Sequence, residues 1–127
     1  MNLSINKIVY NVLEEYPDSE EISVTITAKF GVANEDHYTR AFFLELNING
    51  EEENGNDTRN LTIVARFNYQ LDKVSLSNID EKEIEEDREY FLKFLNRINN
   101  VIIDVTSQDD IGRPPLNINK AIENFNK

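Results

Sequence analysis

The sequence predicts an α+β fold in which a four-stranded antiparallel meander sheet precedes a long helix and a short C-terminal helix. Stretches before residue 72 alternate apolar and polar side chains, whereas apolar residues after Asn78 recur at helical spacing. In addition, no link before residue 78 is long enough to hold the crossover helix that parallel strands would need. The length of 127 residues gives room for a single domain, over residues 1–127.

The alternating stretches predict four strands, over residues 3–13, 22–30, 38–48 and 61–71. The second stretch is the most regular, and β-branched residues occupy many of its positions. The first is blurred, because Leu3, Ile5 and Val9 disturb its alternation. After the fourth stretch the pattern resumes out of phase, which predicts a β-bulge near Asp72-Lys73.

Two of the predicted strands carry apolar residues on both sides. Phe43 follows Phe42 directly, so the two rings must point to opposite faces, and Val64 opposes the face of Ile63. We therefore expect both broad surfaces of the sheet to be apolar, with the chain's own helix covering one of them. Exposed apolar surface usually marks an interaction site, so the other surface is expected to take a client or a second copy.

The helical pattern begins after Asn78 and predicts a helix of about 25 residues. Its apolar stripe consists of Ile84, Phe91, Leu95, Ile98, Ile102 and Val105, widened by Phe94 and Val101. Asp80 and Glu83 resemble a capping box at its start, and the helix is expected to end before Pro114-Pro115. A short last helix would carry apolar residues between 121 and 125, with Asn117 or Asn119 as its cap.

The charge balance restricts the classes of partner. Lys and Arg number 13 against 24 Asp and Glu, so the net charge of -11 argues against binding to nucleic acid or to an anionic membrane. The absence of cysteine excludes disulfides, thiolate metal sites and cysteine nucleophiles. The N-terminal residues alternate instead of forming an apolar block, so we expect neither a signal peptide nor a membrane anchor, and a cytoplasmic location.

The sequence carries no set of residues that is typical of catalysis. A glycine-rich phosphate loop, a serine elbow and a Cys–His pair are all missing, so we expect a non-enzyme without cofactors. His37 reads as a solvated turn residue. The acidic link over residues 49–57 lacks the ligand order of an EF-hand, so no metal site is expected. The acidic run Asp80–Asp87 reads as the exposed start of the long helix.

Three features of the chain together resemble one known protein family. The first is the order of strands and helices, and the second is the hairpin over residues 44–64 with its acidic tip Glu51-Glu52-Glu53. The third is the segment Asp109–Asn119, which contains Gly112-Arg113-Pro114-Pro115-Leu116-Asn117. This segment is similar to the Gly-aromatic-Pro-Pro-Leu-Asn stretch of the SecB-like family, small cytoplasmic holdase chaperones of the protein-export system.

The chain departs from the family at two positions, so it resembles a divergent member. Arg113 stands where the family usually has an aromatic residue. The family's handle for the translocase motor includes an acidic residue in the last strand, whereas Leu61–Gln70 contains no carboxylate and offers Arg66. Coupling to the export motor is therefore not expected from the resemblance, while client binding is unaffected.

The resemblance implies a holdase that binds unfolded or extended polypeptide in apolar grooves without ATP, and that assembles as a dimer of dimers through its sheets and long helices. The residues that we expect to bind peptide are Phe43, Val64, Ile111, Pro114 and Leu116. Those expected in the oligomer interface are Phe91, Phe94, Ile98, Val101 and Val105. Two alternatives stay open: a dedicated partner on the same fold, such as an antitoxin-associated chaperone or a mobile-element accessory protein, and an acidic inhibitor or nucleic-acid mimic.

Overall fold

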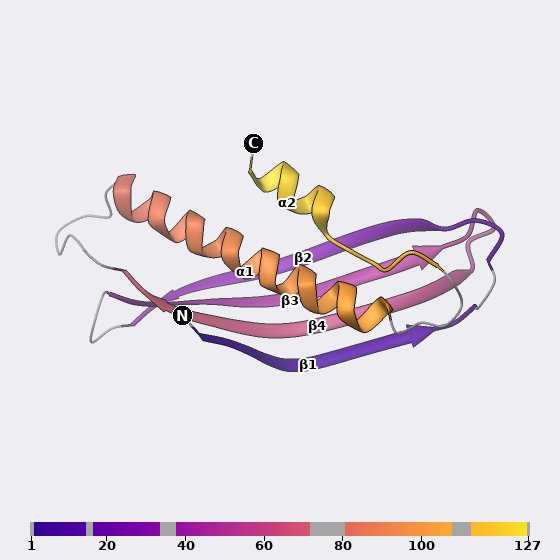
Figure 1. Ribbon diagram of the computed structural model, residues 1–127, viewed down its shortest axis with the longest axis horizontal. Helices are drawn as coiled ribbons and strands as arrows, with labels where there is room; N and C mark the ends of the chain where they lie inside the picture. The colour runs from indigo at the N-terminus through magenta and orange to yellow at the C-terminus, as the bar shows by residue number, and fades with distance from the viewer. Residues whose placement is uncertain (1, 15–16, 34–37, 72–80, 108–112, 127) are drawn as a thin grey trace.

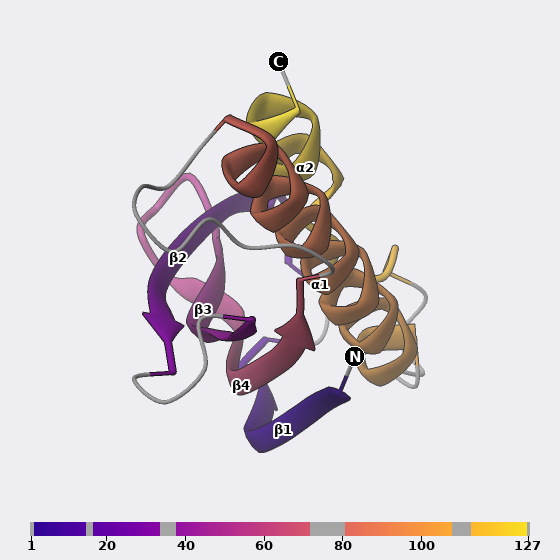
Figure 2. The same cartoon turned by 90° about the vertical axis from the view of Figure 1, so that its left-hand side faces the viewer.

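The fold is that of a curved antiparallel sheet with two helices on one side (Figures 1 and 2). The computed structural model describes residues 2–14, 17–33, 38–71, 81–107 and 113–126. Its elements are β1 (Asn2–Val12), β2 (Glu21–Val32), β3 (Thr39–Glu51), β4 (Asp57–Gln70), α1 (Glu81–Ser107) and α2 (Asn119–Phe125). The predicted fold class is therefore confirmed, and the long helix has 27 residues.

The strand order in the sheet is β1-β4-β3-β2. Strands β2, β3 and β4 follow one another as a meander, in which each strand is antiparallel to the next. Strand β1 pairs with β4 rather than with β2, so the chain passes from one outer strand of the sheet to the other between β1 and β2. Strands β1 and β2 are consequently the two outer strands, and the described part of the connection that includes Pro17-Asp18-Ser19 leads to Glu20, which contacts Thr58 and Arg59 at the start of β4.

One face of the sheet holds the core. Alternate residues of β3 and β4 point to this face, and those from Leu44 to Ile48 and from Leu61 to Tyr69 are almost completely buried. The register of β1 shifts between Ile5 and Lys7. This bulge places Ile5 on the core face together with Ile8, although the two residues are an odd number apart.

Helix α1 crosses the core face diagonally, as Figure 1 shows. Its buried apolar residues are Phe94, Leu95, Ile98 and Ile102, and the ring of Phe94 stacks on Phe67 with centroids 5.2 Å apart. Ile84, predicted as the first residue of the stripe, is instead 57% exposed. The apolar stripe therefore begins later than predicted, because the Ile84 side chain faces the solvent instead of packing on the sheet.

The start of α1 is held to the sheet by a buried ion pair. Arg40 Nη1 donates to Asp87 Oδ2 at 2.6 Å, and the Tyr69 hydroxyl donates to Asp87 Oδ1 at 2.6 Å. Arg40 is a buried residue of β3, so Asp87 compensates its charge where water does not reach. The acidic run was predicted to be exposed, and this is wrong for Asp87.

The link between β3 and β4 is shorter than predicted. Strand pairing continues to Glu51 and Asp57, and the turn between them closes with bonds from Glu52 N–H to the Asn56 carbonyl and from Gly55 N–H to the Glu52 carbonyl. Gly55 has a φ of 89°, in the left-handed region that favours glycine.

Some predictions fall on residues that the structure does not describe. These are the bulge at Asp72-Lys73, the capping box of Asp80 and Glu83, the turn residue His37 and the peptide-binding residue Ile111. Within the described ranges, neither helix combines the length and the apolar character that a membrane crossing needs.

Candidate functional site

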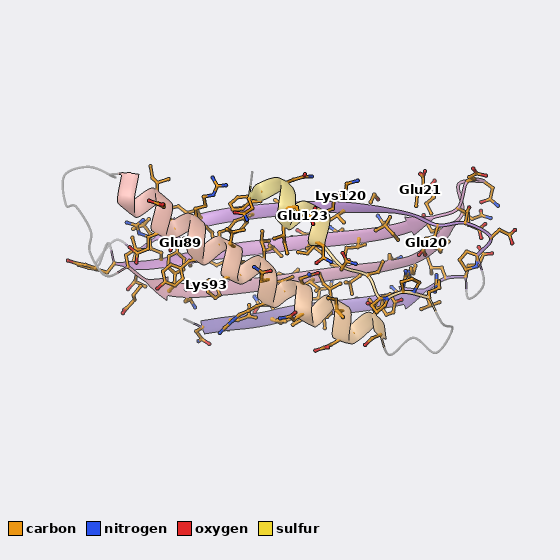
Figure 3. All side chains as sticks on the ribbon, turned by 45° about the horizontal axis from the view of Figure 1, so that its top comes forward. Glu20, Glu21, Glu89, Lys93, Lys120 and Glu123 are labelled. Carbon is orange, nitrogen blue, oxygen red and sulfur yellow. The ribbon has the colours of Figure 1, made fainter. Side chains whose placement is uncertain are left out.

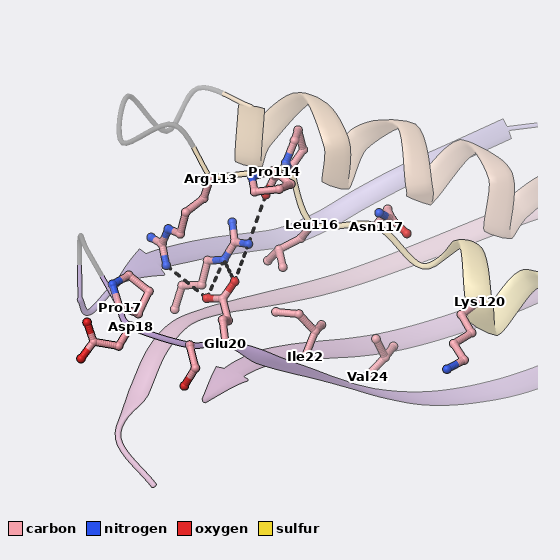
Figure 4. A pocket seen from close by; sticks show the side chains of 13 residues that line it. Pro17, Asp18, Glu20, Ile22, Val24, Arg113, Pro114, Leu116, Asn117 and Lys120 are labelled. Atoms are coloured by element: carbon pink, nitrogen blue, oxygen red, sulfur yellow. Dashed lines mark hydrogen bonds and ion pairs between the residues drawn. The ribbon is translucent and has the colours of Figure 1, made fainter. Parts of the chain in front are cut away.

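A groove of about 640 Å³ opens on the helix side of the sheet, beside the outer strand β2 (Figure 4). Three segments line most of it: residues 17–20 of the connection between β1 and β2, Ile22 and Val24 of β2, and residues 113–117 between the two helices. Arg59 of β4 and Lys120 of α2 complete the lining. Ile22 is 42% exposed and Val24 is 36% exposed. The groove thus combines an apolar floor with walls from two connecting segments.

The carboxylate of Glu20 ties these parts together at one end of the groove. Arg59 Nη2 donates to Glu20 Oε1 at 2.8 Å, Arg113 Nη1 donates to Oε2 at 3.1 Å, and the Thr58 hydroxyl also donates to Oε2. Arg59 Nη2 donates in addition to the Pro114 carbonyl at 3.1 Å. The ion cluster Glu20–Arg59–Arg113 therefore joins the connection before β2, the start of β4 and the segment between the helices.

The packing around this cluster explains two features of the sequence. A Cβ atom added to Gly50 would clash with Thr58 Oγ1 and the Glu20 carboxylate, so this position of β3 has room only for a residue without a side chain. Arg113 directs its guanidinium to the same carboxylate, with Nη1 3.1 Å from Glu20 Oε2, so an ion pair holds the segment between the helices to the cluster.

The charges of this ion cluster shift the pKa values of Glu20 and Arg59. Burial raises the pKa of Glu20, but hydrogen bonds from Arg59 and Thr58, together with the charges of Arg59 and Arg113, outweigh burial and hold that pKa below its ordinary value. The guanidinium of Arg59 is 3% exposed, and its pKa is raised in turn because Glu20 and Tyr10 outweigh its own desolvation. Both groups are therefore charged at neutral pH.

The wall formed by the segment between the helices is fixed by two polar residues of α1. The Thr106 hydroxyl accepts the Leu116 backbone N–H at 2.8 Å, and Asn99 Oδ1 accepts the Ile118 N–H at 2.8 Å. Both side chains are buried, so these bonds satisfy backbone groups that water cannot reach. The N-cap of α2 is Ile118, which corrects the predicted cap, although the Asn117 side chain does accept the Asn119 N–H at 3.1 Å.

The structure divides the predicted peptide-binding residues between two places. Pro114 and Leu116 line the groove, where Leu116 is also part of the core. Phe43 and Val64 lie on the opposite face of the sheet, beside hollows of about 210 and 200 Å³. The four described residues thus do not form one site.

The opposite face of the sheet is polar, so the prediction of two apolar surfaces is wrong. The cross-strand neighbours of Phe43 are Lys29 and Arg66, and the Arg66 guanidinium lies 5.0 Å from the centroid of its ring. Farther along, this face continues with polar residues, which are Ser23, Thr25, Asn47, Asn49, Asn60 and Thr62. Exposed apolar residues gather instead on β1 and β2.

The predicted interface residues of α1 occupy different environments. Phe94 and Ile98 are completely buried in the core of the chain itself. Phe91 is half-buried and packs edge-on against Phe125 of α2, with centroids 5.0 Å apart. Val101 and Val105 are also half-buried. An interface formed by α1 would therefore consist of the half-buried residues Phe91, Val101 and Val105, because Phe94 and Ile98 are already buried inside the protomer.

Several residues that build the groove were not found from the sequence. Asn99 lies four residues after Leu95, and Thr106 lies four residues after Ile102, so both are polar residues on the apolar stripe of the helix. That unusual position was a signal in the sequence that could have indicated them. Glu20 and Arg59 carried no such signal. Figure 3 shows Glu20 beside Glu21, which is the same residue type but whose side chain makes no hydrogen bond or ion pair in the described part of the chain.

Comparison with solved structures finds the SecB-like chaperone Rv1957 of Mycobacterium tuberculosis, in complex with a ChAD peptide from the HigA1 antitoxin Rv1956. The likeness has a TM-score of 0.64 at 12% sequence identity, and covers 92% of this chain and 85% of that chain. A protein of unknown function from Streptococcus agalactiae has 14% identity over 92% of both chains, but a TM-score of 0.37, which carries no argument.

No protein-family model matches the sequence, and the comparison with curated proteins finds no match. At 12% identity, the likeness to Rv1957 bears on the fold alone. It agrees with the strand and helix order described above and with the resemblance predicted from the sequence. The chain therefore has the fold of the SecB-like chaperones.

Proposed function

We propose that the chain binds extended segments of other polypeptides in the groove beside β2 and keeps them from aggregating, without hydrolysis of ATP. The observation that carries this proposal is the apolar floor of the groove, where Ile22 and Val24 of the outer strand β2 remain exposed. Apolar surface that is concentrated in a groove is typical of a binding site. Burial of client side chains would supply the binding energy, so no nucleotide is needed.

The composition supports the same proposal. A net charge of -11 keeps a complex with an aggregating client soluble through mutual repulsion. The absence of cysteine favours the cytoplasm as the place where this activity occurs. Because exposed apolar side chains form the floor of the groove, we propose that it accepts many sequences.

Replacing Val24 by Asp tests the groove directly. We expect the variant to protect a denatured model protein from aggregation at least about tenfold less well, because burial of a valine side chain contributes about 1.5–3 kcal/mol and 1.4 kcal/mol corresponds to a factor of ten. The measurement is light scattering at several ratios of chaperone to client. Thr25→Asp is the matched control, since Thr25 is the next residue of β2 and points to the polar face.

Two results would contradict the proposed function. One is that the wild-type chain does not delay aggregation of several unrelated clients. The other is that Val24→Asp and Thr25→Asp reduce protection equally, which would place the binding surface elsewhere. Circular dichroism of both variants shows whether the sheet is intact.

A dedicated partner is the second candidate. It is favoured by the solved structure of Rv1957, a SecB-like chaperone in complex with a peptide from an antitoxin. For this chain, one ligand would then replace many clients. Capture from host lysate separates the two candidates: many proteins at similar abundance support a general holdase, and one dominant protein supports a dedicated partner.

We further propose that the chain self-associates, and that β1 contributes to the interface. This outer strand exposes Ile5, Ile8, Val9 and Val12, and none of them lines the groove. A dimer of dimers, as the resemblance implies, would add the half-buried residues of α1. A short chain that exposes apolar residues along one edge gains stability from such an association.

Replacing Ile8 by Lys is expected to weaken this association. The new charge would have to enter the interface without a partner, whereas Ser4→Lys changes the opposite face of the same strand and is the matched control. Sedimentation equilibrium at several concentrations measures the effect as a lower mean mass for Ile8→Lys only. A wild-type chain that is monomeric at all concentrations would contradict the proposal.

A further inference from the structure

The outer strand β2 has a free edge: among the described residues, no strand or loop forms main-chain hydrogen bonds with its outer side. It lies at one end of the strand order, and its 12 residues pair with β3 in an unbroken register from Glu21 to Val32. Every second residue of such a strand directs its N–H and C=O groups away from the sheet. Proteins usually protect an edge of this kind with a proline, a bulge or a covering segment. Strand β2 contains neither a proline nor a shift of register.

The other outer strand differs in this respect. Strand β1 changes register between Ile5 and Lys7, and a bulge bends and twists an edge so that a continuous partner strand fits it poorly. The regular edge is the one whose apolar residues line the groove, because Ile22 and Val24 point into it. The groove and the free edge are therefore continuous.

The facing wall of the groove offers few hydrogen bonds. Pro114 and Pro115 have no backbone N–H, and the Pro114 carbonyl already accepts a bond from Arg59 Nη2 at 3.1 Å. A segment that lies between this wall and β2 must still satisfy the polar groups of its own backbone as it loses water. The edge of β2 is the side of the groove that has main-chain donors and acceptors in a regular row.

We propose that a polypeptide bound in the groove adds to the sheet as a fifth strand, paired through its main chain with the free edge of β2. The inference rests on the proposed function and specifies the conformation of the bound segment. Alternate side chains of the segment pack between Ile22, Val24 and the proline wall, while the intervening ones face the solvent. Main-chain bonds supply affinity that is independent of sequence, and the alternate positions select apolar residues.

The charges at the two ends of the groove complement particular flanking residues. Asp18 lies at the end near Glu20, and Lys120 lies beyond Val24 at the other end, as Figure 4 shows. The preferred occupant is therefore an extended segment with Ile or Val at every second position, a basic residue beside Asp18 and an acidic residue beside Lys120. A second copy of this chain, paired edge to edge through β2, is the competing occupant.

Backbone methylation of a synthetic peptide tests the pairing. The probe is a blocked eight-residue peptide with Lys at one end, Glu at the other, and Ile or Val alternating with Thr between them. In two derivatives, one or the other alternate set of amide nitrogens is methylated. Only one set can face β2, so we expect that derivative to bind at least about tenfold more weakly, from two or three lost hydrogen bonds of about 0.5–1.5 kcal/mol each. The other derivative should bind like the parent.

The two derivatives control for each other, since they carry equal numbers of methyl groups and the same side chains. Fluorescence anisotropy with the wild-type chain measures the three affinities. A second readout is amide exchange by NMR. The parent peptide should slow exchange at alternate residues of β2 and leave β1 unchanged.

Each outcome distinguishes the inference from the function on which it rests. If both derivatives bind as well as the parent, or both fail, strand addition is wrong while peptide binding stands. If the parent peptide itself does not bind at millimolar concentration, the proposed function fails as well. If parent affinity falls as the concentration of the chain rises, a second copy occupies the edge and the inference is overturned.

Discussion

Replacing Glu20 by Ala is expected to lower the free energy of unfolding by about 3–5 kcal/mol at neutral pH. The substitution leaves the guanidinium of Arg59, which is only 3% exposed, without the carboxylate that compensates it. It also removes the acceptor for the Thr58 hydroxyl and for Arg113. Urea denaturation measures the loss, with unfolding followed by circular dichroism.

Glu21→Ala is the matched control for this experiment. Glu21 is the next residue of the chain and is exposed, and its side chain makes no hydrogen bond or ion pair within the described ranges, so we expect a change within about 0.5 kcal/mol. An equal loss for both variants would mean that the ion cluster does not stabilise the fold. Because Arg113 and Pro114 belong to the groove wall, Glu20→Ala should also weaken peptide binding, whereas Glu21→Ala should not.

The contribution of Glu20 to the free energy of unfolding depends on pH. Its pKa is lowered in the folded chain, so its contribution is present above the ordinary pKa of 4.5 and is lost as the pH falls through the lower folded value. Glu14 acts in the opposite direction, because a hydrogen bond to Glu52 raises its pKa, and it stabilises the fold only in acid. The difference between wild type and Glu20→Ala should therefore shrink progressively as the pH falls below 4.5, and a difference that stays undiminished down to the acid unfolding of the chain would contradict the assignment.

Replacing Phe94 by Ala is expected to cost the protomer about 3–5 kcal/mol, because the ring is completely buried and its removal leaves a cavity. The ring contacts Phe67, Phe42 and Phe91, all of which would lose a packed neighbour. Denaturation should show this loss at every protein concentration. A role in an oligomer interface, which the sequence suggested for Phe94, would instead lower the mean mass and leave a dilute protomer equally stable.

Phe43→Ala is the matched control, since it removes the same side chain from the polar face of the sheet. Phe43 is 40% exposed and packs mainly beneath the Arg66 guanidinium. We expect a loss of about 1 kcal/mol or less, in the range of a cation–π contact at an exposed site. If Phe43→Ala were as destabilising as Phe94→Ala, the sheet would be covered on both faces after all.

The sequence predicted where the individual strands and helices lie, but it did not predict which side chains from different strands lie next to one another. The period of two located all four strands, although β3 and β4 extend further toward their common turn than predicted. The period of 3.6 located α1, and it also placed Leu95, Ile98 and Ile102 in the core. The bulge in β1 explains why the first strand was blurred, since Leu3 and Ile5 reach the core face only through the shift in register.

The groove could be predicted only in part. Pro114 and Leu116 were chosen through the family resemblance and do line it, whereas Phe43 was chosen because a second apolar face was expected. The pattern of β3 showed correctly that Phe43 points away from Phe42. It could not show that Lys29 and Arg66 flank it, because these residues come from two other strands.

The sequence by itself determined the fold class, the order of the elements and the side of each strand that is buried. These properties follow from the spacing of apolar residues within one element, and spacing is a local property of the chain. The tertiary structure alone decided that β1 lies beside β4, that Glu20 meets Arg59 and Arg113, and that β2 has a free edge next to a wall of prolines. Each of these depends on which distant segments pack together, and that is settled by the burial of the whole core rather than by any one stretch of sequence.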